Sequence, residues 1–442
     1  MNTFIPTVLL TYLSFFQTGF SKPNFVYFQS YLWSLLLTKG HKCMPNLAQP
    51  CFFIDRHLSS WERFLAENTW DVTVMSKTVV QILIAKLGDS LKVHGAYLAA
   101  LDTTLIAKTW GKMLGVQRWH QASENADRGD SLMGHHWGIL GLISFSGVLG
   151  RYLCWPILMR LIPGQHNPFL WVVDPNGVIM QASFWEAVLP LVYHLAEVLH
   201  QAPLRVVADA YFCKAPFLQP LIERGIDVIS RMRKDAVGWD DPVYCGRGRP
   251  PKHGKKWKLA ELVTHFPTET IPVFLYGKTV ELAGVVRDVW IRDVSQKVRV
   301  VVVEGIKEPL IFLCTDLSLT AAQILEIYGA RFSIELALRD LKGYLGLGDY
   351  QCTTFQAILR FVHVACTALC LFRLILLKED TRSMGGQANA ESFKKEAPLS
   401  LSTLRRRFQA FAFQRILFSK SALGAELQKG NPKVEQLLRI AA

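Results

Sequence analysis

Two short apolar runs of the chain each end in an aspartate. Asp102 follows the run Leu98-Ala-Ala-Leu, and Asp209 follows the run Arg205-Val-Val-Ala. Each run is typical of a buried β-strand, and the carboxyl ends of parallel strands form the functional edge of an open α/β sheet. The pattern therefore predicts that the two carboxylates lie side by side. The alternative is that each aspartate only caps a turn after its strand.

A predicted helix over residues 320–345 carries a third carboxylate between two cations. Tyr328, Arg331, Glu335 and Lys342 are spaced by three, four and seven residues. At about 100° per residue they fall within an arc of roughly 60° on one helix face. An apolar stripe beside them would pack the helix on the sheet and let Glu335 face the two aspartates. The alternative is a solvated face on which Arg331 and Glu335 form an ordinary ion pair one turn apart.

Three converging carboxylates with cations beside them suit phosphodiester chemistry. Carboxylates can hold two Mg²⁺ ions about 3.5–4 Å apart, which activate the attacking water or 3′-hydroxyl and stabilise the leaving oxygen. We therefore predict that Asp102, Asp209 and Glu335 are both the catalytic residues and the metal ligands. Arg331 would bind DNA phosphates through its bidentate fork, and Lys342 would bind them as a point charge.

Several segments resemble one known family. Tyr328-Gly-Ala-Arg-Phe-Ser-Ile-Glu335, with Lys342 seven residues later, resembles the Tyr-Arg-Glu-Lys signature of bacterial insertion-sequence transposases of the DDE group. Three more segments are similar to the same family: Leu101-Asp-Thr-Thr-Leu, Gly134-His-His-Trp and Val207-Ala-Asp-Ala-Tyr-Phe. Together with a weaker likeness at His57-Leu-Ser-Ser-Trp, the resemblance covers roughly residues 25–375.

The resemblance implies a cut-and-paste transposase with an α/β, RNase H-like core. In such an enzyme a β-rich insertion separates the second aspartate from the glutamate, Mg²⁺ is required with Mn²⁺ as a substitute, and Tyr328, Arg331 and Lys342 contact DNA. The implied partners are the terminal inverted repeats and target DNA, bound by a homodimer in a synaptic complex.

The family often has tryptophan after the signature arginine, where this chain has Phe332. Some relatives insert a tryptophan at a flipped base, and Trp290 is a candidate for that role; we interpret it instead as a core indole.

A basic segment runs from Gly246 to Lys258. Its glycines and prolines argue against regular structure. We therefore predict a loop that binds DNA phosphates through Arg247, Arg249, Lys252, Lys255 and Lys256. Within it, Arg247-Gly-Arg-Pro is also similar to the core of an AT-hook, in which arginines enter a narrow minor groove.

The changing hydrophobic pattern divides the chain, which is too long for one ordinary core. The predicted parts are a helical N-terminal DNA-binding module at 1–92, a first part of the catalytic core at 93–238, the basic loop and β-rich insertion at 239–312, a second part of the core with the Glu-bearing helix at 313–378, and a linker with a basic helical C-terminal tail at 379–442. Strands are expected at 97–102, 136–143, 169–173, 204–209 and 227–232 in the core and at 271–277, 281–287 and 298–303 in the insertion, with helices at 184–200 and 356–377.

The composition favours a polyanionic partner. Lys and Arg number 49 against 36 Asp and Glu, a net charge of +13, which suits nucleic acid or an acidic membrane surface.

Nine cysteines without a paired C-x-x-C framework favour a reducing cytoplasm, where the protein would be nucleoid-associated. Cys366 and Cys370 are interpreted as core residues. His120, His135 and His136 are expected to form hydrogen bonds in the core or in loops, with contact to DNA or metal as the alternative.

The mean hydropathy of +0.19 requires a membrane protein to be considered. Residues 131–150 lack formal charge but hold five glycines and two histidines, and residues 361–372 are too short to span a bilayer. Residues 1–21 also lack charge. We interpret them as a buried first helix or the result of a start codon placed too early, with a membrane segment as the alternative.

Three rival functions remain open at this point. A nuclease of the same fold would cut DNA without joining it. A noncatalytic relic of a transposase would bind DNA only, although the intact set of Asp102, Asp209 and Glu335 argues against it. A polytopic membrane protein is the third.

Overall fold

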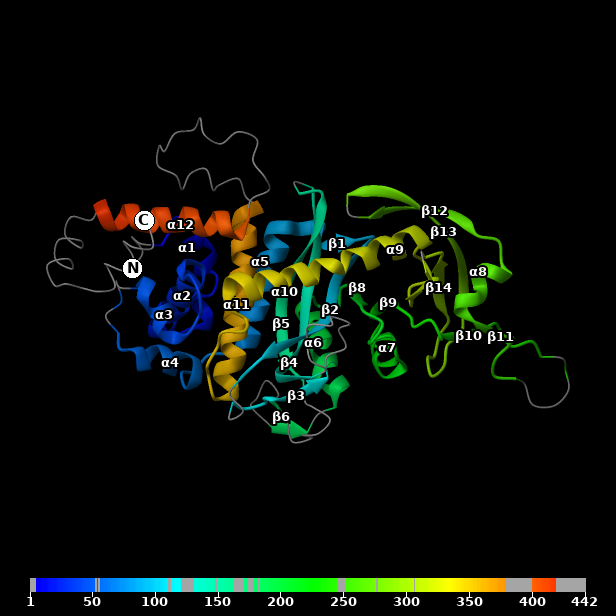
Figure 1. Cartoon of the computed structure of the whole chain (residues 1–442), viewed down its shortest axis with the longest axis horizontal. Coiled ribbons are helices and arrows are strands. Elements are labelled where there is room, and N and C mark those ends of the chain that lie inside the picture. The colour runs from blue at the N-terminus through cyan, green and yellow to red at the C-terminus, as the bar shows by residue number, and fades with distance from the viewer. Residues whose placement is uncertain are drawn as a thin grey trace, which may run out of the picture.

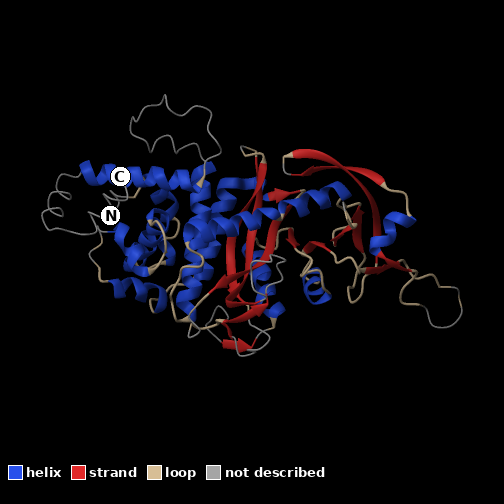
Figure 2. Ribbon diagram, in the orientation of Figure 1, coloured by secondary structure: helices blue, strands red, loops and turns tan. Residues whose placement is uncertain are grey.

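The molecule has a mixed α/β architecture, seen in the computed structural model of Figures 1 and 2, with a helical region at one end and a long sheet that runs to the other. The structure describes residues 5–51, 54, 56–109, 113–120, 131–147, 149–162, 171–173, 179–181, 183–244, 246, 251–275, 277–305, 307–377 and 400–418.

Eleven of the described strands form one mixed sheet. They are β1 (Lys92–Val93), β2 (Ala96–Ala107), β3 (Gln117–His120), β4 (Ser131–Ser146), β5 (Arg151–Leu161), β8 (Leu204–Ala208), β9 (Asp227–Arg231), β12 (Glu269–Leu275), β13 (Lys278–Val289), β14 (Val298–Val303) and β15 (Leu310–Cys314). Nine follow the order β12-β13-β14-β15-β9-β8-β2-β4-β3, while β1 pairs with β2 and β5 with β4. At the centre, β2 is antiparallel to β4 and parallel to β8, and β8 is parallel to β9. This arrangement is consistent with an RNase H-like core.

The predicted strand at 169–173 does not belong to this sheet. Its described part, β6 (Trp171–Val173), pairs with β7 (Ile179–Gln181) in a separate two-stranded sheet. The third long strand of the core is instead β5, in which Pro156 interrupts the apolar run. Within the described strands β5 pairs with β4 alone, and the register shifts between Leu140 and Gly141 beside the proline. Edge strands and bulges tolerate a proline, whereas central strands do not.

The strands predicted as a separate insertion are part of the main sheet. β12, β13 and β14 run antiparallel to one another, and β15 joins them to the core by pairing with β9. The basic segment is likewise not entirely a loop, because β11 (Lys256–Lys258) pairs with β10 (Val237–Trp239). The indole of Trp257 is half-buried and donates to Asp240 at 2.6 Å, so tertiary pairing overrides the local glycine and proline signals.

The described residues include twelve α-helices. They are α1 (Thr7–Ser14), α2 (Lys22–Leu37), α3 (Met44–Ala48), α4 (Leu58–Ala66), α5 (Val72–Leu87), α6 (Phe184–Val198), α7 (Ala215–Ile222), α8 (Leu262–His265), α9 (Ala321–Ala330), α10 (Phe332–Leu345), α11 (Phe355–Leu377) and α12 (Leu401–Phe418). The helical reading of the N-terminal region is thereby confirmed. The helix predicted over 320–345 is two helices that meet at Arg331, begun by the capping box of Thr320 and Gln323 and ended by Gly346 at φ 67°. They cross the front of the central strands in Figure 1.

The N-terminal helices and α12 pack around α11. Buried Arg360 of α11 donates to the carbonyl of Leu65 at 3.0 Å and to that of Trp70 at 2.6 Å. Arg405 of α12 donates to the carbonyl of Leu36 on α2 at 2.8 Å, and Phe408 is fully buried. The helical part of the predicted basic tail is therefore a packed element of this region and not a free extension. The predicted linker and the last residues, 378–399 and 419–442, lie outside the described residues.

α11 has the length and hydropathy to cross a membrane, so the prediction that this segment is too short was wrong. It is the only described helix with these properties, and 94% of its most apolar 18-residue window is buried inside the protein. At the N-terminus, Leu9, Leu13 and Phe16 are at most 1% exposed, which confirms the interpretation of this segment as a buried helix for its described part.

Candidate active site

Asp102 and Asp209 lie on neighbouring parallel strands. β2 and β8 pair up to Leu101 and Ala208, and Asp102 and Asp209 directly follow these two residues in the chain. The prediction that they lie side by side is therefore consistent with the register. The prediction that Asp102 ends its strand is wrong, because β2 continues to Ala107 while paired with β4. β8 does end before Asp209, and this opens the edge of β2 at Asp102.

Arg331 connects Asp102 to the helix that carries Glu335. Its guanidinium donates to Oδ2 of Asp102 at 3.3 Å and to Oε1 of Glu335 at 2.7 Å. The side chains of Asp102 and Arg331 are 15% and 16% exposed, whereas that of Glu335 is 43% exposed. The ordinary pair of Arg331 with Glu335 thus exists, but it is one half of a bridge from α10 to β2.

The environment of Asp102 makes its negative charge costly. Burial raises the pKa of this carboxyl to about 6, the largest effect, against which the Arg331 guanidinium and the backbone N–H of Thr103 act to lower it. The charges of Asp209 and Glu335 both raise the pKa of Asp102 further. Asp209 and Glu335 therefore both act on Asp102 electrostatically, as expected at a site that receives positive charge.

The three carboxylates fit Mg²⁺ by chemistry, because hard divalent cations prefer carboxylate oxygens. Their placement is less favourable: among the described residues there is no group of three or more His, Cys, Asp and Glu side chains that could hold a metal ion. The Arg331 guanidinium lies between Asp102 and Glu335. These two side chains would share a cation only after Arg331 moves off at least one of them.

The other two residues of the helix stripe also lie along this edge. The Arg331 guanidinium is 5.8 Å from the centre of the Tyr328 ring, and Lys342 donates to the carbonyl of Leu105 on β2 at 3.4 Å. Burial raises the pKa of Tyr328, Arg331 and Arg231 lower it, and Asp209 raises it. Tyr328 is therefore within electrostatic range of Asp209 as well as of Arg331.

Three residues that follow β8 or end β9 were not identified from the sequence. The backbone N–H of Tyr211 donates to Oδ1 of Asp209 at 3.0 Å, and Tyr211 is 43% exposed. Lys214 Nζ lies 4.4 Å from the centre of the Tyr211 ring. Arg231 is exposed, has no ion pair with a described residue, and ends β9 beside β8. Its place near the end of the strand predicted at 227–232 is the signal that could have identified it.

The basic segment lies apart from these carboxylates. Figure 1 shows β10 and β11 at the far end of the sheet from α10. Lys252, Lys255 and Lys256 are exposed, and Lys255 Nζ lies 3.8 Å from the centre of the Trp257 ring. Arg247 and Arg249 are outside the described residues, so the structure does not bear on the AT-hook interpretation.

The remaining sequence candidates divide between core and surface. His135 is fully buried and hydrogen-bonds the Tyr350 hydroxyl at 2.7 Å and the Leu114 carbonyl at 2.8 Å, so its interpretation as a core residue is confirmed. His136 is half-buried, burial lowers its pKa to about 4, and its Nδ1 has no hydrogen-bond partner among the described residues, contrary to expectation. Cys366 and Cys370 are buried in α11, as expected. The Trp290 indole donates to Asp241 at 2.9 Å.

Comparison with known protein families gives two matches. A family model described as DDE superfamily endonuclease matches residues 16–268, more than half of the chain. A second, described as Transposase DDE domain, matches residues 189–371, which include Asp209, Arg331 and Glu335. No curated protein matches the chain.

Proposed function

The chain belongs to the DDE superfamily of endonucleases, and we propose that it is a cut-and-paste DNA transposase of the insertion-sequence group with the Tyr-Arg-Glu-Lys signature. Its transposase DDE domain makes it an enzyme of DNA transposition or cleavage. The proposal of a transposase with this signature rests on the contacts of Arg331, which connect the helix that carries the signature to Asp102 on β2. A helix face that is only solvated would not contact that strand.

In this proposal Asp102, Asp209 and Glu335 hold the divalent metal, Mg²⁺ or its substitute Mn²⁺. When bound, the metal ions activate the attacking oxygen and stabilise the leaving oxygen of the phosphodiester. Asp102 and Asp209 supply ligands from two paired strands, so their separation is fixed by the sheet. Glu335 approaches from α10, and its greater exposure allows it to adjust when Arg331 leaves it for a DNA phosphate.

The cations of the site would bind and orient the DNA strand. Arg331 can exchange carboxylates for a phosphate because its fork recognises both in the same bidentate geometry. Tyr328 and Lys342 extend this contact along α9 and α10, and Lys214 and Arg231 extend it on the side of Asp209. The substrate would be the terminal inverted repeats and then target DNA, bound by a homodimer in the cytoplasm at the nucleoid, with further phosphate contacts from the N-terminal module and the basic segment.

The test is strand transfer by the purified chain. A DNA fragment that carries the sequences flanking the coding region is incubated with the protein, Mg²⁺ and a target plasmid, and a Glu335→Gln preparation serves as the control. We expect excision, followed by joining of the 3′ ends to the plasmid with a short target duplication. Cleavage without joining would support a nuclease of the same fold instead. Specific binding with neither reaction would support a noncatalytic relic.

A further inference from the structure

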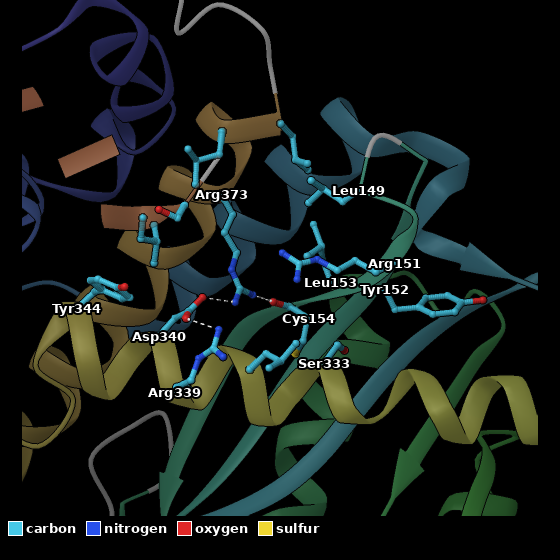
Figure 3. A pocket seen from close by; sticks show the side chains of 15 residues that line it. Leu149, Arg151, Tyr152, Leu153, Cys154, Ser333, Arg339, Asp340, Tyr344 and Arg373 are labelled. Atoms are coloured by element: carbon cyan, nitrogen blue, oxygen red, sulfur yellow. Dashed lines mark hydrogen bonds and ion pairs between the residues drawn. The ribbon is translucent and has the colours of Figure 1, made fainter. Parts of the chain in front are cut away.

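A cavity lies on the side of α10 that faces away from Glu335 and Lys342. It has a volume of about 180 Å³ and is bounded by α10, the start of β5, the end of α11 and the start of α12 (Figure 3). Ser333 and Asp340 line it from α10. At about 100° per residue, both point roughly opposite to Glu335, so the cavity and the active site use two faces of one helix.

The polar lining of the cavity has an excess of positive charge. Arg151, Arg339 and Arg373 share the wall with a single carboxylate, Asp340. Arg373 is 8% exposed and donates to Asp340 at 2.9 Å and to the carbonyl of Cys154, while Arg339 lies 3.4 Å from the same Asp340. One carboxylate is thus divided between two guanidinium groups, and a formal charge of +2 remains in the lining.

Arg151 faces this group without a carboxylate of its own. It is exposed at the start of β5 and has no ion pair with a described residue. Figure 3 shows its side chain and that of Arg373 entering the cavity from opposite walls. Two guanidinium groups that face each other repel unless an anion lies between them.

A buried hydroxyl adds an unfilled hydrogen-bonding group to the lining. Ser333 is 4% exposed, and its Oγ has no hydrogen-bond partner among the described residues. Buried polar atoms are nearly always paired, so such an atom calls for a partner. The volume is below the roughly 300 Å³ at which sites for drug-sized ligands begin, so a small group fits better than a whole nucleotide.

We propose that this cavity binds a phosphate-type oxyanion between Arg151 and Arg373. The anion is either a free phosphate or one phosphate of a DNA backbone that passes over α10, because both present the same oxygens to a guanidinium fork. The site is distinct from the catalytic carboxylates and does not depend on the transposase proposal. Since α10 contributes to both, an anion held here would also steady the helix that carries Glu335.

The free-anion arm measures the binding of inorganic phosphate by calorimetry and by the rise of Tm with phosphate concentration, at constant ionic strength. We expect saturable binding to the wild-type chain and at least about tenfold weaker binding to Arg151→Ala, since a hydrogen bond to a charged group is worth that factor. Ser333→Ala should also bind phosphate more weakly, yet without phosphate its Tm should not fall, because the hydroxyl has no partner to lose. Arg292→Ala, at another exposed arginine, is the matched control and should behave as wild type.

The DNA arm measures the affinity of a short duplex of arbitrary sequence as a function of salt. If the anion is a backbone phosphate, Arg151→Ala should flatten the slope of log affinity against log salt by about 0.9, and Arg292→Ala should not. A difference between the two variants in either arm supports the site and identifies the source of the phosphate. If Arg151→Ala and Arg292→Ala behave alike in both arms, the proposal is wrong.

Discussion

The guanidinium of Arg331 lies 3.3 Å from the carboxylate of Asp102, although 229 residues separate them in the chain. Arg331 occupies the junction of α9 and α10, and Asp102 lies in the middle of β2. The contact offsets part of the cost of burying the Asp102 charge and holds the signature helix against the strand. A DNA phosphate that binds both terminal nitrogens of Arg331 would therefore compete with Asp102 and Glu335 for this guanidinium.

Removing the cations of the stripe should affect cut DNA more than intact DNA. In Arg331→Ala and Lys342→Ala we expect affinity for duplexes with nicked or bent ends to fall at least about tenfold, as for the loss of one charge-assisted contact. Affinity for intact duplex should change little. Gel-shift titrations with the two kinds of DNA measure this, with Arg292→Ala as the control. Equal losses on both DNAs would make these residues general phosphate contacts.

Metal binding should depend on pH through Asp102. Its pKa of about 6 means that protons compete with a metal ion for this ligand below that pH. We expect the affinity for Mn²⁺, measured by electron paramagnetic resonance of the free ion, to be constant above about pH 7. It should then fall about tenfold per unit below about pH 6, as one proton displaces the metal. In Asp102→Asn the affinity for Mn²⁺ should be lower and should not fall further below about pH 6. An affinity of the wild type that does not change with pH would contradict the assignment of Asp102 as a metal ligand.

The same carboxyl should make the metal-free protein less stable at neutral pH. The folded pKa of Asp102 is above its unfolded value, so its charged form disfavours folding above about pH 6, and this cost is relieved as the pH falls from about 6 to 4. Asp102→Asn should therefore be more stable than wild type by about 1–3 kcal/mol at pH 8 in a chelator. Below about pH 4 the difference should vanish. Denaturant unfolding at both pH values tests this, and a variant less stable at pH 8 would contradict it.

The exposed lysines of the basic segment should contribute to DNA affinity without contributing to catalysis. Lys252→Ala and Lys256→Ala should each flatten the salt dependence of DNA binding by up to about 0.9, and leave the Mg²⁺ requirement unchanged. Point substitutions are preferable to deletion of the segment, because β11 pairs with β10 and its removal would cost stability. Salt titrations of duplex binding measure the effect, and unchanged slopes would show that these lysines do not contact DNA.

The sequence predicted the placement of the aspartates better than the extent of the strands that carry them. The runs before Asp102 and Asp209 were correctly read as strands, because short apolar segments between polar residues are distinctive. β5 was missed because Pro156 lies within it, and only its place at an edge makes that proline acceptable. The continuity of β12–β15 with the core depends on the pairing of β15 with β9, and local sequence carries no information about that pairing.

Helical periodicity explains only part of the arrangement of the residues on α9 and α10. Helical periodicity correctly put Arg331 and Glu335 on one face, but it could not reveal that the helix is interrupted at Arg331 or that its guanidinium reaches β2. Lys214 and Arg231 were overlooked because neither belongs to a spaced motif. Their relevance comes from tertiary neighbours, the Tyr211 ring for one and Tyr328 for the other.

The most direct test of a three-carboxylate, metal-dependent site compares cleavage and binding in the same preparations. Asp102→Asn, Asp209→Asn and Glu335→Gln are incubated with the DNA that flanks the coding region, in the presence of Mg²⁺ or Mn²⁺, and both strand cleavage and DNA affinity are measured. We predict that each variant loses cleavage by at least about a thousandfold while binding DNA nearly as well as wild type, because a metal site fails when any bridging ligand loses its charge. Metal-dependent cleavage at close to the wild-type rate by any of the three would remove that residue from the site and contradict the account.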